Sequence, residues 1–117
     1  MAKYVDGFVL PIPKKNIKAY QKVAKFAGKI WKEYGALEYI ECIADDVKPG
    51  KWTSFPQSVK LKKNEVVFFS YIVYKSRADR NRIMKKIMKD PRFHAPEMMP
   101  FDGKRMIFGG FKPVVSM

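Results

Sequence analysis

Hydrophobic positions follow two different periods along the chain, and each change of period marks an expected element. Residues 4–10 are β-branched, aromatic or apolar, which predicts a first strand that Pro11 and Pro13 bring to an end. Over residues 14–34 the apolar positions recur with helical spacing while lysines occupy the other side. This pattern predicts an amphipathic helix, and Gly35 suits the left-handed position just past its end.

Two further apolar segments predict strands. Residues 36–44 form a second strand, and residues 65–75, the segment richest in β-branched and aromatic side chains, form a third. The connection between them is long, and such loops are usually lids, hairpin extensions or disordered segments. Within it Val59 and Leu61 alternate with lysines, so a short additional strand is expected there.

The last third of the chain repeats the order of helix and strand. Ser76 is expected to cap a second helix, with Asp79 completing a pair like a capping box, and Asp90 with the following proline ends it. A final strand is expected over residues 104–112, where paired glycines indicate a bulge or a close backbone approach. The apolar face of this helix is expected to consist of Ile83, Met84, Ile87 and Met88.

The order strand, helix, strand, strand, helix, strand predicts a ferredoxin-like α+β fold (βαββαβ). A four-stranded antiparallel sheet would carry two helices on one face, in a single domain over residues 1–117. Both alternating sets of residues 66–74 are apolar, so the helix-free face would expose several large side chains to water. We expect an identical subunit to cover that face, which makes the protein a homodimer built as a dimeric α+β barrel.

The charge balance adds one further class of partner. The chain has 117 residues, with 24 Lys and Arg against 11 Asp and Glu, and this net charge of +13 attracts anions. Nucleic acid is a possible partner but not the preferred one, because the positive charge is mostly lysine and is spread along the chain. The best phosphate-facing surface would be the second helix, through Arg77, Arg80, Arg82, Lys85, Lys86 and Lys89.

Other classes are not supported. Cys42 is the single cysteine and the sequence holds no set of Cys and His ligands, so no metal and no cofactor are expected. A single cysteine, which cannot form an internal disulfide, also fits a reducing cytoplasm. The amino-terminal segment carries Asp6 and two prolines where a signal peptide needs an unbroken apolar run, and no apolar segment is long enough to span a membrane. We therefore expect a cytoplasmic protein.

The loop that follows the second strand carries the densest candidate chemistry. Asp45 and Asp46 could act as a catalytic general base or as metal ligands, and Lys48 and Lys51 could hold an anion. Trp52 and Phe55 could pack against a ligand. The alternative is that two aspartates before Pro-Gly simply form turns through bonds to the backbone.

Three other positions are candidates. His94 is the only histidine, and therefore a candidate catalytic group or a residue that only packs in its loop. Asp102 and Arg105 could clamp a ligand, or form an ion pair at the start of a strand. Asp6 lies in an apolar strand, so it must be paired, with Arg105 or a tyrosine hydroxyl, or face a wet cavity.

Five stretches resemble the YbaA-like bacterial proteins, a domain of unknown function. They are YVDGFVLPIPKKN (4–16), WKEYGALEYIECIADDVKPGK (31–51), TSFPQSVKLK (53–62), VYKSRADR (73–80) and MPFDGKRMIFGGFK (99–112). The resemblance implies the dimeric α+β barrel superfamily, in which two ferredoxin-like subunits pack sheet against sheet. That superfamily includes cofactor-independent monooxygenases, haem-using enzymes and small stress-response proteins, so membership implies no single chemistry.

The leading hypothesis from the sequence is a homodimer that binds or transforms a small molecule. Its cavity would lie between the sheet and the helices, near loop 45–56, with His94 and the turn from Asp102 to Arg105 on the rim. One alternative is a basic dimer that binds RNA nonspecifically, and another is a structural or regulatory dimer without a ligand. Whether a reaction is catalysed stays open at this point.

Overall fold

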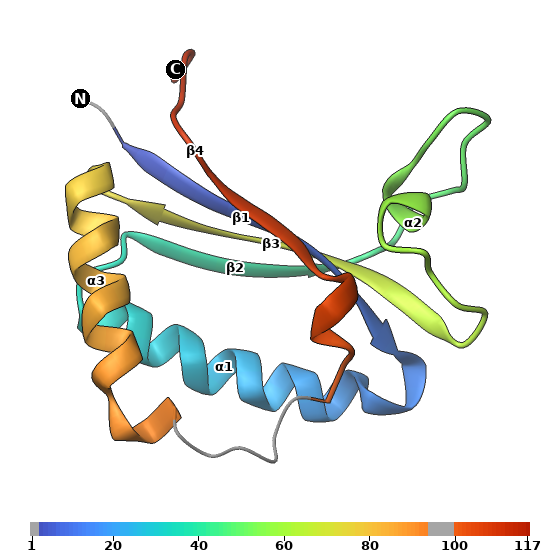
Figure 1. Ribbon diagram of the computed structural model, residues 1–117, viewed down its shortest axis with the longest axis horizontal. Coiled ribbons are helices and arrows are strands. Elements are labelled where there is room, and N and C mark those ends of the chain that lie inside the picture. Colours follow the sequence, from blue (N-terminus) through green and yellow to red (C-terminus); the bar gives the residue numbers. More distant parts are fainter. Residues whose placement is uncertain (1–2, 94–99) are drawn as a thin grey trace.

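The computed structural model describes residues 3–93 and 100–117, which form a two-layer α+β structure (Figure 1). The antiparallel sheet has the strand order β2-β3-β1-β4, and α1 and α3 both lie on one face of it, as the ferredoxin-like fold requires. The elements are β1 (Tyr4–Pro13), α1 (Ile17–Glu33), β2 (Glu38–Ile43), α2 (Phe55–Ser58), β3 (Glu65–Tyr74), α3 (Arg77–Lys89) and β4 (Ile107–Phe111).

The first strand runs through both prolines, so the prediction that it ends before them was wrong. The amide of Lys14 donates to the carbonyl of Asn64 at the end of the β1–β3 ladder. Because alternate residues of an antiparallel strand bond to opposite sides, Pro11 and Pro13 turn their nitrogens away from β3. On that side β4 pairs with β1 only as far as Val9, so neither proline removes a ladder hydrogen bond.

Both long helices begin and end close to the positions that the sequence indicates. A 3₁₀ turn precedes α1, and Gly35 adopts φ +115° just past its end. The Ser76 hydroxyl accepts a hydrogen bond from the amide of Asp79 at 3.0 Å and so caps α3. Met88 is 72% exposed, which corrects its expected place on the apolar face. No helix of residues 3–93 and 100–117 is long and apolar enough to cross a membrane.

The loop before β3 contains a short helix instead of the expected strand. Ser54 caps α2, and Lys60 has a positive φ of 49°, which no strand can pass through. The alternation of Val59 and Leu61 with lysines has another cause: Val59 is buried against Val67 on the helix-free face of the sheet.

The start of β4 also differs from the prediction. Lys104 and Arg105 belong to a 3₁₀ turn, because the Asp102 side chain accepts from the amide of Lys104 and binds the Arg105 guanidinium. The ladder of β4 with β1 then runs in one register without a bulge.

The core on the helix side consists of two separate clusters. One packs α3 and the end of α1 against the sheet around Ile30, Tyr74 and Ile83, and the other packs the start of α1 around Ile12 and Tyr20. Phe8 contacts both clusters from the central strand. The space between them is the cavity described below.

The helix-free face is covered only in part. The segment around Val59 protects one end of it, where α2 lies across the sheet from α1 (Figure 1). The remainder carries Phe69, which is 42% exposed, Ile107 and Phe111, which is 63% exposed, together with Cys42. The prediction of an apolar second face is therefore confirmed by the exposed side chains.

Gly110 gives the close approach that the paired glycines indicated. A Cβ there would overlap the guanidinium of Arg80 on α3 and the hydroxyl of Tyr4. By contrast, a Cβ at Gly103 would have no neighbour within 4 Å.

Substitution of these two glycines should therefore have opposite outcomes. We expect Gly110→Ala to lower the free energy of unfolding by about 1–3 kcal/mol, the usual cost of forcing atoms into a packed site. Gly103→Ala should change it by less than about 0.5 kcal/mol, as surface substitutions do. Urea denaturation of both variants measures the difference, and equal stabilities would contradict the close approach.

Candidate functional site

A cavity of about 310 Å³ lies between the sheet and the two long helices. Its walls are mostly apolar and aromatic, which is typical of small-molecule sites, and its volume falls at the lower end of their range of roughly 300–1,000 Å³. Prominent among the lining residues are Phe8, Trp31, Ile72, Phe93, Phe101 and Met106.

Small residues in facing elements explain why the core leaves this space. Ala24 and Ala27 present only methyl groups from the middle of α1, and Ser70 is the one small polar residue in the apolar centre of β3. Gly28 is required next to them, because a Cβ there would meet the ring of Tyr39. The helix thus approaches β2 closely without filling the space above β3.

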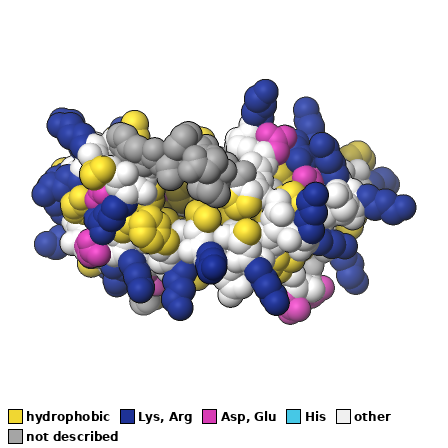
Figure 2. Space-filling model, turned by 90° about the horizontal axis from the view of Figure 1, so that it is seen from below, with side chains coloured by type: hydrophobic (Ala, Val, Ile, Leu, Met, Phe, Trp, Pro, Cys, Tyr) yellow, Lys and Arg dark blue, Asp and Glu magenta, His cyan; other side chains and the backbone are white. Residues whose placement is uncertain are grey.

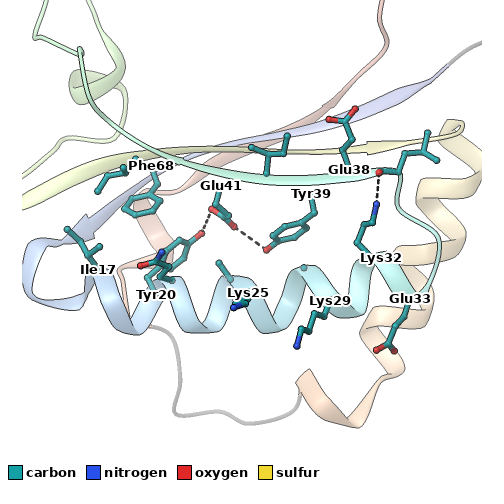
Figure 3. A pocket seen from close by; sticks show the side chains of 16 residues that line it. Ile17, Tyr20, Lys25, Lys29, Lys32, Glu33, Glu38, Tyr39, Glu41 and Phe68 are labelled. Carbon is teal, nitrogen blue, oxygen red and sulfur yellow. Dashed lines mark hydrogen bonds between the residues drawn. The ribbon is translucent and has the colours of Figure 1, made fainter.

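One carboxylate forms part of the cavity wall. Glu41 on β2 accepts hydrogen bonds from the hydroxyl of Tyr20 at 2.8 Å and from the hydroxyl of Tyr39 at 3.1 Å (Figure 3). Tyr20 comes from α1 and packs edge-on against Phe68, so its hydroxyl position is set by the core. The two phenols therefore hold Glu41 in one orientation at the boundary of the cavity.

Burial sets the proton affinity of these groups. It raises the pKa of Glu41 above its ordinary value, while hydrogen bonds from Tyr20, Tyr39 and Ser70 to the carboxylate oppose the rise. Burial, followed by the nearby Glu41 charge, raises the pKa of both tyrosines, so they stay protonated donors. The site thus combines a carboxylate of raised pKa with two neutral phenols.

A wider groove outside the cavity gives access to the same residues. It runs between α1 and the edge strand β2, has a volume of about 1240 Å³ and is open to solvent. Tyr20, Ala24, Tyr39 and Glu41 line both spaces, so the hydrogen-bonded triad lies between them. Lys25 and Lys29 lie along the helical side of this groove (Figure 3).

The 45–56 loop does not border this cavity, which corrects the expected rim. The Phe55 ring packs edge-on against Phe69, with centroids 5.9 Å apart, and Phe69 points away from the helices. The loop therefore lies on the helix-free side of the sheet. Asp46 and Lys48 are exposed there, and Trp52 is 86% exposed with the Lys51 ammonium over its ring.

Two residues of the loop do line a smaller pocket on that side. Asp45 and Phe55 border a space of about 260 Å³ together with Cys42, Val67 and Phe69. This pocket therefore lies on the partly exposed apolar face of the sheet.

Asp6 is paired with Arg80, which the sequence did not indicate, and with the hydroxyl of Tyr74, which agrees with the expected tyrosine partner. The Nε of Arg80 donates to Asp6 Oδ1 at 3.1 Å, and the same guanidinium lies over the ring of Tyr4. Arg105, the other partner expected from the sequence, binds Glu65 and Asp102 instead. Asp6 thus links the central strand to α3 and does not face the cavity.

Arg105 serves as a structural clamp. Its guanidinium donates two bonds to the buried carboxylate of Glu65, at 2.8 and 2.6 Å, and a third to Asp102 at 3.0 Å. The hydrogen bonds from Arg105 hold the pKa of Glu65 below its ordinary value. The turn still borders the cavity, but through its apolar flanks Phe101 and Met106 and not through Asp102 or Arg105.

His94 lies outside the described residues, so its predicted role stays a prediction. Its neighbour in sequence, Phe93, lines the cavity and packs edge-on against Trp31. Within residues 3–93 and 100–117, no group of three or more His, Cys, Asp and Glu side chains is arranged to hold a metal ion.

The basic surface of α3 is smaller than its sequence implies. Arg80 binds Asp6, and Arg82 binds Asp79 and the carbonyl of Tyr34. On the helix side of the molecule, lysines and arginines surround hydrophobic side chains and are not gathered into one patch (Figure 2).

Sequence reasoning missed the triad of Tyr20, Tyr39 and Glu41. A signal was present, since a glutamate two residues after a tyrosine in a strand must share its face. Which face that is becomes clear only from the pairing of Tyr39 with Ile72 and of Glu41 with Ser70.

Known proteins resemble this chain over nearly its whole length. The family model described as "Protein of unknown function (DUF1428)" matches residues 3–103. "Uncharacterized protein YbaA" of Escherichia coli (strain K12) is 48% identical over 115 residues, which is 97% of this chain and 98% of that protein. The YbaA protein of Shigella flexneri matches with the same identity and coverage.

Two solved structures share the fold at low sequence identity. A dimeric ferredoxin-like protein from an uncultured marine organism has a TM-score of 0.59 and 14% identity, with 100% of this chain and 98% of that chain covered. A NIPSNAP family protein with unknown function from Agrobacterium tumefaciens str. C58 has a TM-score of 0.59 and 20% identity, with 95% and 87% covered.

The raised pKa of Glu41 predicts a pH-dependent effect of Glu41→Gln. A carboxyl group whose folded-state pKa is raised stabilises the fold below its unfolded pKa of 4.5, and this contribution is lost as the pH rises through the folded-state pKa. The stability of Glu41→Gln relative to wild type should therefore increase from pH about 4 to about 8.

Urea denaturation at several pH values measures this difference. Asp46→Asn is the matched control for the loss of a carboxylate, because Asp46 is exposed. A Glu41→Gln difference that stays constant with pH would contradict the proposed environment of Glu41.

Proposed function

The chain belongs to the DUF1428 family of proteins of unknown function, and we propose that it binds a small, mostly apolar organic molecule in the cavity between its sheet and helices. The observation that carries this proposal is an apolar cavity of about 310 Å³ with one oriented carboxylate in its wall. Pockets of this kind, with few polar groups among aromatic walls, are the usual sites of small ligands.

The aromatic lining favours a flat ligand. Trp31 contacts Tyr39 and Phe93 through its ring, and its indole N–H donates to the hydroxyl of Tyr74 at 3.1 Å, which fixes the ring against the cavity. Glu41 and the two phenols supply the polar contact that would orient such a ligand. The groove between α1 and β2 is the route by which it would arrive.

Filling the cavity should abolish retention of the natural ligand. Ala27 lines the cavity, so Ala27→Phe places a ring inside it, whereas Ala19→Phe places the same ring on the exposed side of the same helix. We expect mass spectrometry of small molecules retained by the native protein to find a compound with wild type and with Ala19→Phe but not with Ala27→Phe.

The two tryptophans allow a second readout of the same binding. In a Trp52→Phe background Trp31 is the only tryptophan, and it lies in the cavity wall. Release of the retained compound should change Trp31 emission. Equal retention by Ala27→Phe and Ala19→Phe would contradict the cavity as the binding site.

We also propose that the protein acts as a homodimer, with the helix-free faces of two sheets packed together. The exposed side chains of Phe69, Ile107 and Phe111 form an apolar surface that the chain itself leaves uncovered. An identical face has the matching chemistry, and two-fold contacts are the commonest way in which such faces are buried. The similar marine protein is described as dimeric, which supports the same arrangement.

Substitution of two phenylalanines of β4 can distinguish the proposed interface from other exposed apolar surface. Phe111 lies on the helix-free face, over Gly7 and Gly109, whereas Phe108 lies on the helix side beside Phe8 and is 70% exposed. Burying a phenylalanine contributes about 1.5–3 kcal/mol, and a two-fold axis doubles the loss. Phe111→Lys should therefore weaken dimerisation by about 100-fold or more.

Sedimentation at several concentrations checks this expectation. Phe108→Lys should sediment as the wild-type dimer does, although it removes an equally exposed ring. A stable, non-aggregating monomer of the wild-type protein at micromolar concentration would contradict the dimer.

A further inference from the structure

The wall of the cavity brings together the parts of a proton-transfer site. Glu41 is the only carboxylate among the described residues that line the cavity, and it lies between the apolar cavity and the open groove along α1. Two phenol donors reach its two oxygens separately, Tyr20 at Oε1 and Tyr39 at Oε2. A structural ion pair would instead place a cation here, as Arg105 is placed on Glu65.

We propose that this site moves a proton within a neutral carbonyl compound, with Glu41 as the base and Tyr39 as the donor to the carbonyl oxygen. The inference rests on the proposed binding function, because the carbonyl compound must occupy the same cavity. The substrate class is a flat, uncharged ketone or related carbonyl compound with an acidic C–H bond next to the carbonyl carbon.

Isomerisation needs no other reactant, whereas proton exchange needs solvent water, which enters from the open groove and exchanges a hydrogen with the protonated Glu41 between the two steps. In the first step the C–H bond breaks, its proton binds a carboxylate oxygen of Glu41, and its electron pair forms the carbon–carbon double bond of an enolate. In the second step the O–H bond of Glu41 breaks, and a C–H bond forms at the same carbon or at the far end of a conjugated system. The net change is proton exchange or isomerisation, and Glu41 returns to the carboxylate.

Tyr39 is the phenol suited to contact the substrate. Its hydrogen bond to Glu41 is the longer of the two, and its ring lies beside Trp31 on the cavity wall. Tyr20 is fixed by edge contacts with Phe68 and Phe101, so it acts as a positioning residue that holds the carboxylate.

Transfer of the Tyr39 hydrogen bond from Glu41 to the substrate would make Glu41 a stronger base. The bond from Tyr39 lowers the pKa of Glu41, so its transfer to a substrate oxygen increases the proton affinity of the carboxylate. The same phenol then stabilises the negative charge that develops on that oxygen, as oxyanion donors do. A buried carboxylate with a pKa shifted toward neutrality is an effective base near neutral pH.

Deuterium incorporation measures the proton transfer directly. The probes are 2-tetralone and phenylacetone in D₂O, with exchange of their α-protons followed by NMR and binding followed by Trp31 emission in the Trp52→Phe protein. We expect the protein to accelerate exchange, Glu41→Gln to lower the enzymic rate by roughly 100-fold or more, and Tyr39→Phe to lower it by about 100-fold. Asp46→Asn, which also converts a carboxylate to an amide, should exchange at the wild-type rate.

Two further variants separate chemistry from folding. Glu41→Asp keeps the carboxylate and should retain part of the rate even if Glu41→Gln is poorly folded. Tyr20→Phe removes a hydrogen bond that lowers the pKa of Glu41, so the fall in rate on the acid side should begin at higher pH than in wild type. A purely structural role for Tyr20 would leave the shape of that pH profile unchanged.

The outcomes distinguish this proposal from the binding proposal. Binding of a ketone without faster exchange, or equal rates in wild type and Glu41→Gln, overturns proton transfer and leaves ligand binding intact. If neither ketone alters Trp31 emission, the substrate class is wrong, and the retention experiment with Ala27→Phe still decides whether the cavity binds a ligand.

Discussion

The sheet is apolar on both faces, and the chain supplies long helices for only one of them. On the helix side, Ile30, Ile83 and Tyr20 bury the sheet in two clusters and leave a cavity between them. On the other side only the segment around Val59 covers the strands, and Phe69 and Phe111 stay accessible. The proposed ligand site and the proposed dimer interface thus lie on opposite faces of one sheet. Consecutive residues of β3 point to one face and then the other.

Local patterns were sufficient to predict the architecture. Helical spacing over α1, Gly35 at its end and the Ser76 cap each act within a few residues, and each has the conformation that its chemistry favours. The predictions were wrong at positions whose conformation depends on contacts between residues far apart in the sequence. The prolines of β1 are tolerated because β4 stops short of them, and Val59 alternates with lysines because it packs on the sheet, although its backbone is not extended.

The candidate site could be predicted less well, because membership of a site depends on which face of a strand each residue occupies. The 45–56 loop is rich in chemistry, but it lies across the sheet from the cavity. A tyrosine hydroxyl was expected as a partner of Asp6 and is present, but Arg80 of α3, 74 positions away in the sequence, was not foreseen. Nothing in the sequence around Glu41 marks it as a site residue; only the strand register and the packing of α1 show a half-buried carboxylate bonded to two phenols.

The prolines of β1 have a consequence beyond the strand that contains them. Past Val9 no strand of the described residues pairs with the outer edge of β1, but the turn before β4 lies near it and Pro11 is fully buried there. Because proline has no N–H, Pro11 leaves no unpaired donor at this buried position, where another residue would bury an amide without a strand partner. The sheet can thus end its β1–β4 ladder at Val9 and use the rest of that edge for packing against the turn.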